Sequence, residues 1–252
     1  MHESSARSEA PPPPPARRIV ASDTAELAET AAGWIATALA EAAASGIVTI
    51  ALAGGRTPQP VYRRLAEPPH DGRFPWDRLE VYFSDERAVP PDHPESNYRT
   101  AFESLLGRVP IQPERVHRME AEQRDLETAA RAYAALLPAS LDLLLLGIGA
   151  DGHVASLFPH APSLTERRRK VLAVTGGEPL IQRLTVTPIV IEAARRVLVL
   201  VNGSDKAAVV AQALEGPYHP ALMPAQLARL ATWIMDRAAA SALSDRGLGP
   251  IR

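Results

Sequence analysis

The segment from Leu141 to Pro159, with the sequence LDLLLLGIGADGHVASLFP, constrains the fold of this chain more than any other. Its first six residues form a nearly continuous apolar run, which is typical of a strand buried on both faces of a parallel sheet. A glycine-rich turn follows, and Asp151, Gly152 and His153 come directly after it. Because ligands of open α/β sheets lie at the carboxyl ends of the strands, this pattern predicts a carboxylate and an imidazole in a ligand site.

Three glycines of this segment, Gly147, Gly149 and Gly152, match the G-x-G-x-x-G fingerprint of dinucleotide-binding proteins. Three observations argue against that interpretation. Pro159 can end a helix shortly after Gly152, whereas the phosphate-binding helix should run for several turns. The fingerprint normally belongs to the first βα unit, but here it lies past the middle of the chain, and dinucleotide binding does not require a histidine. We therefore do not expect NAD to bind.

The composition is that of an ordinary globular protein and excludes several functional classes. A chain of 252 residues can bury a substantial core, and its net charge of -2 gives no signal for nucleic acid or a membrane surface. No apolar run reaches transmembrane length, and five prolines stand where a signal peptide needs its apolar core. The absence of cysteine excludes disulfides and thiolate chemistry and fits a cytoplasmic protein. The seven histidines show no ligand spacing, so we expect no metal.

Strand-like and helix-like segments alternate along most of the chain. Residues 1–18 are polar and proline-rich, and we expect a disordered tail there, followed by a single α/β domain over 19–252. The alternation predicts a mostly parallel sheet with helices on both faces. The expected strands are 47–53, 79–83, 116–119, 141–146, 171–174, 183–186, 196–201 and 231–235. The expected helices are 22 to about 46, 59–65, 97–106, 125–137, 189–195, 204–214 and one that begins at 236.

One loop combines glycines with the start of a helix. Gly54, Gly55, Arg56 and Thr57 follow the first strong strand, and Pro58 suits the first turn of the next helix. Glycines let backbone N–H groups approach an anion, and the N-terminus of a helix adds positive potential. We therefore predict a phosphate-binding loop. The alternative is a tight turn with a capping threonine.

Charged side chains follow two further strands. Arg87 comes shortly after the strand at 79–83 and could grip phosphate with two hydrogen bonds, while Asp85 and Glu86 could pair with it. The alternative is a surface cluster of ion pairs. Lys206 lies in the first turn of a predicted helix, where a cation opposes the helix dipole unless an anion binds there.

Six motifs of the chain resemble those of the 6-phosphogluconolactonase family: GGRTP, SDERAVPPDHPESNY, GIGADGHVASLFPH, RLTVTP, NGSDKA and HPALMPAQL. The resemblance runs from about residue 47 to the C-terminal helix. It implies a Rossmann-like sheet shared with glucosamine-6-phosphate deaminase and ribose-5-phosphate isomerase. It also implies hydrolysis of 6-phospho-D-glucono-1,5-lactone, in the oxidative pentose phosphate pathway, without a cofactor. We expect a monomer whose partner is this small sugar-phosphate lactone.

In that reaction the site residues receive the following roles. His153 is expected to take a proton from the attacking water and to return it to the ring oxygen, because imidazole titrates near neutrality. The alternative for this residue is a histidine at a helix start that bonds only to the backbone. Asp151 would orient either His153 or the water. Backbone N–H groups around Gly149 to Gly152 would meet the oxyanion. The residues expected to bind the substrate, most of them at its phosphate, are Gly54, Gly55, Arg56, Thr57, Asp85, Arg87, Asn97, Gly149, Gly152 and Lys206.

Two departures from the family pattern concern this site. Arg56 stands where members often have serine, and it adds a cation near the expected phosphate. Residues 176–179 read Gly-Gly-Glu-Pro where members often carry a Lys-Pro-Pro run, so no contact of that run is carried over to this chain.

Two other functions are compatible with the same fold. A glucosamine-6-phosphate deaminase usually has tyrosine in place of Arg87 and an Asn-Glu-Pro stretch after the histidine, whereas this chain has Ser-Leu-Phe-Pro over 156–159. The glutamate expected to support ring opening is therefore missing. A sugar-phosphate-binding regulator would sense its ligand without turnover, and only an assay separates it from an enzyme.

Overall fold

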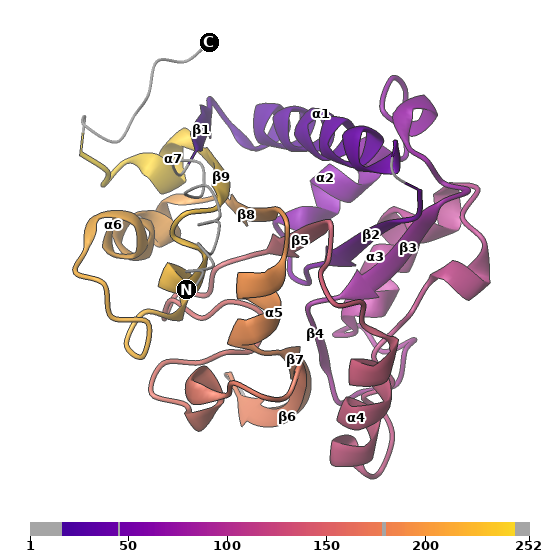
Figure 1. Cartoon of the computed structure of the whole chain (residues 1–252). Helices are drawn as coiled ribbons and strands as arrows, with labels where there is room; N and C mark the ends of the chain where they lie inside the picture. The colour runs from indigo at the N-terminus through magenta and orange to yellow at the C-terminus, as the bar shows by residue number, and fades with distance from the viewer. Residues whose placement is uncertain (1–16, 45, 178–179, 245–252) are drawn as a thin grey trace, which may run out of the picture.

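The computed structural model describes residues 17–44, 46–177 and 180–244. Its main feature is a six-stranded sheet with the order β1-β9-β8-β5-β2-β3, in which all neighbouring strands run parallel (Figure 1). The strands are β1 (Arg18–Ala21), β2 (Val48–Leu52), β3 (Leu79–Phe83), β5 (Leu143–Leu146), β8 (Val197–Val201) and β9 (Thr232–Asp236).

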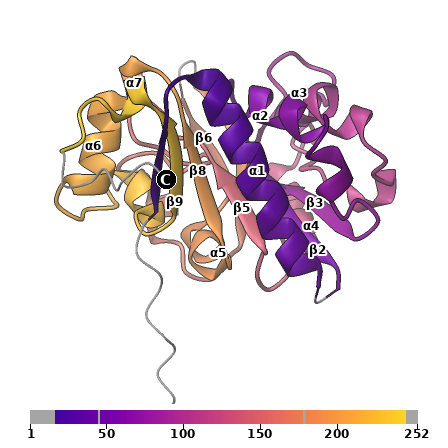
Figure 2. The same cartoon turned by 90° about the horizontal axis from the view of Figure 1, so that it is seen from above.

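Helices cover both faces of this sheet. Figure 1 shows α1 (Thr24–Ala43) and α2 (Pro58–Leu65) above it and α5 (Pro188–Ala193) below it, and the view from above shows α1 lying over the sheet, roughly along β5 and β8 (Figure 2). The other α-helices are α3 (Asn97–Ser104), α4 (Leu126–Leu136), α6 (Ala207–Glu215) and α7 (Arg237–Ala240). Short 3-10 helices are η1 (Asp71–Arg73), η2 (Leu106–Arg108), η3 (Pro113–Arg115), η4 (Pro162–Thr165), η5 (Ser204–Lys206) and η6 (Pro224–Ala228). The predicted α/β architecture is confirmed.

The hydrophobic pattern explains why these elements form. All four residues of β5 are fully buried leucines, as expected for a central strand covered on both faces. Helix α1 begins because the Asp23 carboxylate accepts the N–H groups of Ala25 and Glu26, and Glu26 in turn accepts the N–H of Ser22. Full burial of a large apolar side chain, such as Leu27, Ile35 or Leu39 on the inner face of α1, contributes about 1.5–3 kcal/mol.

A second, smaller sheet was not predicted. It has the order β4-β7-β6, and its strands β4 (Asp85–Arg87), β6 (Val171–Gly176) and β7 (Ile181–Val186) pair antiparallel. We expected 85–87 to be a loop, which is wrong, because charged residues have low strand propensity and the pairing partner is distant in sequence. The segments expected at 171–174 and 183–186 are longer and belong to this sheet.

Three further differences concern the ends of elements and weak strands. Strand β1 was missed, and it starts inside the expected tail: the N–H of Trp233 donates to the carbonyl of Arg17 (2.8 Å), and Arg18 pairs with Trp233. Residues 1–16, the rest of that tail, lie outside the described residues. The predicted strand at 116–119 is wrong, since Val116 forms only an isolated bridge to Val81. The C-terminal helix α7 has only four residues. The division into a tail and a single domain stays a prediction.

Candidate active site

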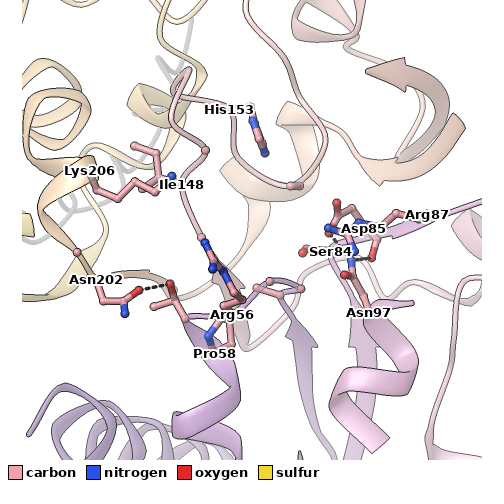
Figure 3. A pocket seen from close by; sticks show the side chains of 18 of the residues that line it. Arg56, Pro58, Ser84, Asp85, Arg87, Asn97, Ile148, His153, Asn202 and Lys206 are labelled. Atoms are coloured by element: carbon pink, nitrogen blue, oxygen red, sulfur yellow. Dashed lines mark hydrogen bonds between the residues drawn. The ribbon is translucent and has the colours of Figure 1, made fainter. Parts of the chain in front are cut away.

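A cavity of about 480 Å³ lies at the carboxyl ends of four parallel strands (Figure 3). It is lined by residues that follow β2, β3, β5 and β8, together with Arg183 from β7. The chain proceeds from β2 toward one edge of the sheet and from β5 toward the other, so the cavity lies where the strand order reverses. This is where open α/β sheets bind their ligands.

The loop after β2 offers unused hydrogen-bond donors to the cavity. Gly54, Gly55, Arg56 and Thr57 all line it, and Pro58 opens α2 as expected. Among the described residues, no acceptor receives the backbone N–H groups of these four residues. Such N–H groups at the start of a helix bind anions, which agrees with the predicted phosphate loop.

Thr57 does not cap the helix that follows it. Its side chain makes no capping bond, and its hydroxyl donates instead to Oδ1 of Asn202 (2.5 Å). The alternative of a capping threonine is therefore wrong. The bond joins the loop after β2 to the loop after β8, which also brings Lys206 to the cavity, where its ammonium lies 3.8 Å from Asp205.

Gly54 leaves room for Asn97, the first residue of α3. A Cβ atom on Gly54 would lie 1.9 Å from Oδ1 of Asn97. The amide nitrogen of Asn97 donates to the carbonyl of Asp85 (2.9 Å) and to its carboxylate (3.0 Å). The sequence prediction that Asn97 belongs to the site agrees with its place in the cavity wall.

Asp85 is a buried carboxylate whose neighbours differ from those expected. It accepts hydrogen bonds from Asn97 and from the hydroxyl of Ser156 (2.7 Å), and the guanidinium of Arg183 lies 4.0 Å away. The expected partner was Arg87, but that guanidinium donates to the carbonyl of Glu95. Alternate side chains of strand β4 point to opposite faces, so the carboxylates of Asp85 and Glu86 lie on different faces of the strand.

Glu86 organises the start of α3 instead of pairing with Arg87. Its carboxylate accepts the backbone N–H groups of Asn97 and Tyr98 (both 2.8 Å) and the hydroxyl of Ser96 (3.0 Å). Burial raises the pKa of this carboxyl although the hydrogen bonds oppose the shift. The alternative of a surface ion-pair cluster is therefore wrong for Glu86, which is buried.

His153 lines the cavity and Asp151 stands behind it. Nδ1 of His153 lies 2.6 Å from Oδ1 of Asp151, and the same oxygen accepts the backbone N–H of His153 (3.1 Å). Partial burial raises the pKa of Asp151, but the hydrogen bonds and the charge of His153 outweigh it and lower the pKa below its usual value. No helix begins at His153, so the alternative of a helix-start histidine is wrong, and the phosphate helix of a dinucleotide site is missing.

Of the backbone N–H groups from Gly149 to Gly152 that we expected around the oxyanion, those of the two glycines are used elsewhere. The N–H of Gly149 donates to the carbonyl of His153 (2.9 Å), and the N–H of Gly152 donates to that of Gly149 (3.1 Å). Gly152 does not line the cavity, and its positive φ of 86° forms the turn. A Cβ atom on Gly149 would lie 2.1 Å from Nδ1 of His153, so this glycine makes room for the imidazole.

Several residues of the cavity wall were missed by sequence reasoning. Arg183 pairs in register with Arg87 across β4 and β7, and burial lowers the pKa of its guanidinium. The motif RLTVTP contains Arg183, but only the antiparallel pairing shows that it reaches the site. Ser84, Ile148, Asn202 and Asp205 also line the cavity.

The cations of the site fall into two groups. Figure 3 shows Lys206, Asn202 and Arg56 on one side of the pocket, Asp85, Arg87 and Asn97 on the other, and His153 facing the space between them. Arg87 and Lys206, which we expected at one phosphate, therefore lie on opposite walls.

Over 17–44, 46–177 and 180–244, no group of three or more His, Cys, Asp or Glu side chains is arranged to hold a metal ion. In the same residues, no helix has both the length and the apolar character needed to cross a membrane.

Comparisons with known proteins agree with the geometry. The sequence model of the family described as "Glucosamine-6-phosphate isomerases/6-phosphogluconolactonase" matches residues 22–235. The chain belongs to this family. It is 40% identical over 253 residues to the 6-phosphogluconolactonase of Streptomyces coelicolor, covering 92% of this chain and 96% of that protein. It is 37% identical over 221 residues to that of Mycobacterium tuberculosis, covering 81% and 88%.

Solved structures of the family have the same fold. The 6-phosphogluconolactonase of Trypanosoma brucei has a TM-score of 0.80 with 28% identity, covering 91% of this chain and 99% of that one. A monomeric glucosamine-6-phosphate deaminase also reaches a TM-score of 0.80, with 24% identity over 90% of this chain and 99% of that one. The second likeness shows a shared fold only.

Proposed function

We propose that this chain hydrolyses 6-phospho-D-glucono-1,5-lactone to 6-phospho-D-gluconate, with His153 as the catalytic base. The main observation in support of the proposal is the position of His153 between Asp151 and the cavity. Its Nδ1 is held by Asp151 at 2.6 Å, and its ring lines a cavity beside a loop of unused N–H donors. The 6-phosphogluconolactonases named above support the choice of substrate.

We assign the proton on the imidazole from its contact with Asp151. A carboxylate accepts hydrogen bonds, so Nδ1 carries the hydrogen and Nε2 keeps a lone pair. Nε2 takes a proton from water as the water oxygen bonds to C1. When the C1–ring oxygen bond breaks, the imidazolium returns that proton to the departing oxygen. His153 is therefore neutral again at the end of the cycle, and the carboxylic acid formed at C1 releases its proton to water to give the gluconate.

The phosphate is assigned to the wall formed by the loop after β2. Gly54, Gly55 and Thr57 supply backbone N–H groups, and Lys206 and Arg56 supply positive charge on the same side of the pocket. This remote binding energy places the lactone carbonyl near His153.

The opposite wall is assigned to the lactone end of the substrate. The N–H groups of Gly149 and Gly152 are engaged within their own loop, so these two glycines do not donate them to the oxyanion. Arg87 and Arg183 lie next to each other on β4 and β7 and both line the cavity. We assign the carbonyl oxygen to this pair, and Asp85 and Asn97 hold the wall in place.

The residues after the histidine do not fit deamination of glucosamine 6-phosphate. Residues 156–158 give Ser, Leu and Phe after the histidine, and Ser156 bonds to Asp85 in the interior. Monomeric state, cytoplasmic location and cofactor-free chemistry stay predictions.

The test compares two substrates on the same protein. Freshly generated 6-phosphogluconolactone, corrected for spontaneous opening, should be hydrolysed, whereas glucosamine 6-phosphate should release no ammonia. Ammonia release without acceleration of lactone opening would contradict the proposal. Binding of 6-phosphogluconate with neither activity would indicate a ligand-sensing protein.

A further inference from the structure

The hydrogen bond to Asp151 alone does not fix the imidazole of His153. It holds one ring nitrogen, and the Asp151 side chain that accepts it is 49% exposed. An imidazole held at one atom can still tilt about that bond, which moves Nε2, the atom that takes the proton. A second contact is needed to fix the ring plane.

The aromatic ring of Phe158 supplies that contact. Its centroid lies 4.7 Å from the centroid of His153, and the two planes are inclined by 50°. This distance is within the range in which ring pairs attract. Phe158 does not line the cavity, so it is not placed to touch a bound sugar phosphate.

The smaller sheet fixes the position of the Phe158 ring. A Cβ atom on Gly176, the last residue of β6, would lie 2.2 Å from Cε2 of Phe158, so the ring occupies the space that a side chain would fill. The guanidinium carbon of Arg183 lies 5.7 Å from the ring centroid. The ring is therefore packed between the loop that carries His153 and two strands of another sheet.

We infer that Phe158 is a positioning residue, which holds the imidazole of His153 at the angle needed for proton transfer, and that Gly176 is glycine in order to seat this ring. The inference rests on the proposed function, because it takes His153 as the base. It gives the smaller sheet a role in the proton-transfer step, because β6 positions the ring of Phe158 and this ring positions the imidazole of His153.

The test uses Phe158→Leu and Gly176→Ala, with Gly72→Ala as the matched control. A Cβ atom on Gly72 has no neighbour within 4 Å, so this control adds the same methyl group at a remote open position. Both test variants should lower kcat about 10- to 100-fold, because a small misplacement of a catalytic group has an effect of this order. KM and the affinity for 6-phosphogluconate should stay close to those of the unmodified enzyme, and the control should keep full activity.

A second comparison shows whether Phe158 acts through His153. In the His153→Ala background, adding Phe158→Leu should cause no further loss of the residual rate. A further loss there, an unchanged kcat in Phe158→Leu, or a change mainly in KM would overturn the inference. If Phe158→Leu does not fold, Gly176→Ala decides, because it keeps the ring and changes only its position.

The outcomes also separate this inference from the proposed function. If the unmodified chain does not open the lactone, or if His153→Ala keeps its turnover, the proposed function fails. If the unmodified chain opens the lactone and His153→Ala loses its turnover, but Phe158→Leu still turns over at the unmodified rate, only the positioning role fails.

Discussion

Lys206 and Arg87 are two cations of one cavity with different surroundings. Lys206 lies beside the glycine loop and 3.8 Å from Asp205. Arg87 lies on the opposite wall, opposite Arg183 in the ladder of β4 and β7. A phosphate dianion at the glycine loop would contact Lys206 before and throughout the reaction. Arg87 would instead contact the lactone carbonyl, whose charge changes during the reaction.

Lys206→Ala should raise KM for 6-phosphogluconolactone. A hydrogen bond to a charged group contributes about 1.5–3 kcal/mol, which corresponds to roughly a 10- to 150-fold change in affinity. Contacts present in both ground state and transition state act on KM more than on kcat. Steady-state kinetics with the phosphorylated lactone measures this change.

Glucono-1,5-lactone, which has no phosphate, is the control for Lys206→Ala. Its slow hydrolysis should be unchanged by that substitution and depressed by Arg87→Ala. Equal loss on both lactones in Lys206→Ala would mean that the lysine acts on the fold or on the chemistry, and that the phosphate is assigned to the wrong wall.

Among the connecting elements, the turn between η4 and β6 depends on one carboxylate. Glu166 accepts the backbone N–H groups of Arg167 (3.0 Å), Arg168 (2.8 Å) and Arg169 (3.2 Å), and also the side chain of Arg169. Hydrogen bonds to Arg168 and Arg169 lower the pKa of Glu166 to about 2. The turn leads directly into β6, the strand that seats Phe158.

The low pKa of Glu166 predicts a pH-dependent contribution to stability. The folded-state pKa of about 2 lies below the ordinary value of 4.5, so the contribution is complete above pH 4.5 and is lost as the pH falls toward 2. Glu166→Gln should therefore lower Tm at neutral pH and weaken its dependence on pH over that interval.

Thermal unfolding at several acidic pH values tests this prediction. The matched control is Glu192→Gln, which removes an exposed carboxylate from α5. If Tm falls with decreasing pH between pH 4.5 and 2 as steeply in Glu166→Gln as in the unmodified protein, the role assigned to Glu166 in this turn is contradicted.

For the whole molecule, the parallel sheet apart from its edge strand β1 was predictable, because its signals are local. Buried apolar runs such as 143–146 indicate strands, and the carboxyl ends of parallel strands lie at the same edge of the sheet. Four segments far apart in sequence, those that follow β2, β3, β5 and β8, could therefore be assigned to one site, and residues of all four line one cavity.

The smaller sheet and its consequences were not predictable from the sequence. Strand β4 consists of charged residues, and its pairing with β7 joins positions about a hundred residues apart. The role of Arg183 and the partners of Asp85 depend on that pairing. The bond from Thr57 to Asn202 likewise joins two loops that no sequence pattern relates.

The central claim is that His153 opens the lactone, and the turnover of His153→Ala tests it most directly. We predict that kcat for 6-phosphogluconolactone, corrected for spontaneous opening, falls about 10²- to 10⁴-fold, the usual contribution of a positioned general base. The thermal unfolding transition and the affinity for 6-phosphogluconate should be retained, because the imidazole is partly exposed at the cavity wall. A folded His153→Ala protein that hydrolyses the lactone at nearly the unmodified rate would contradict the account.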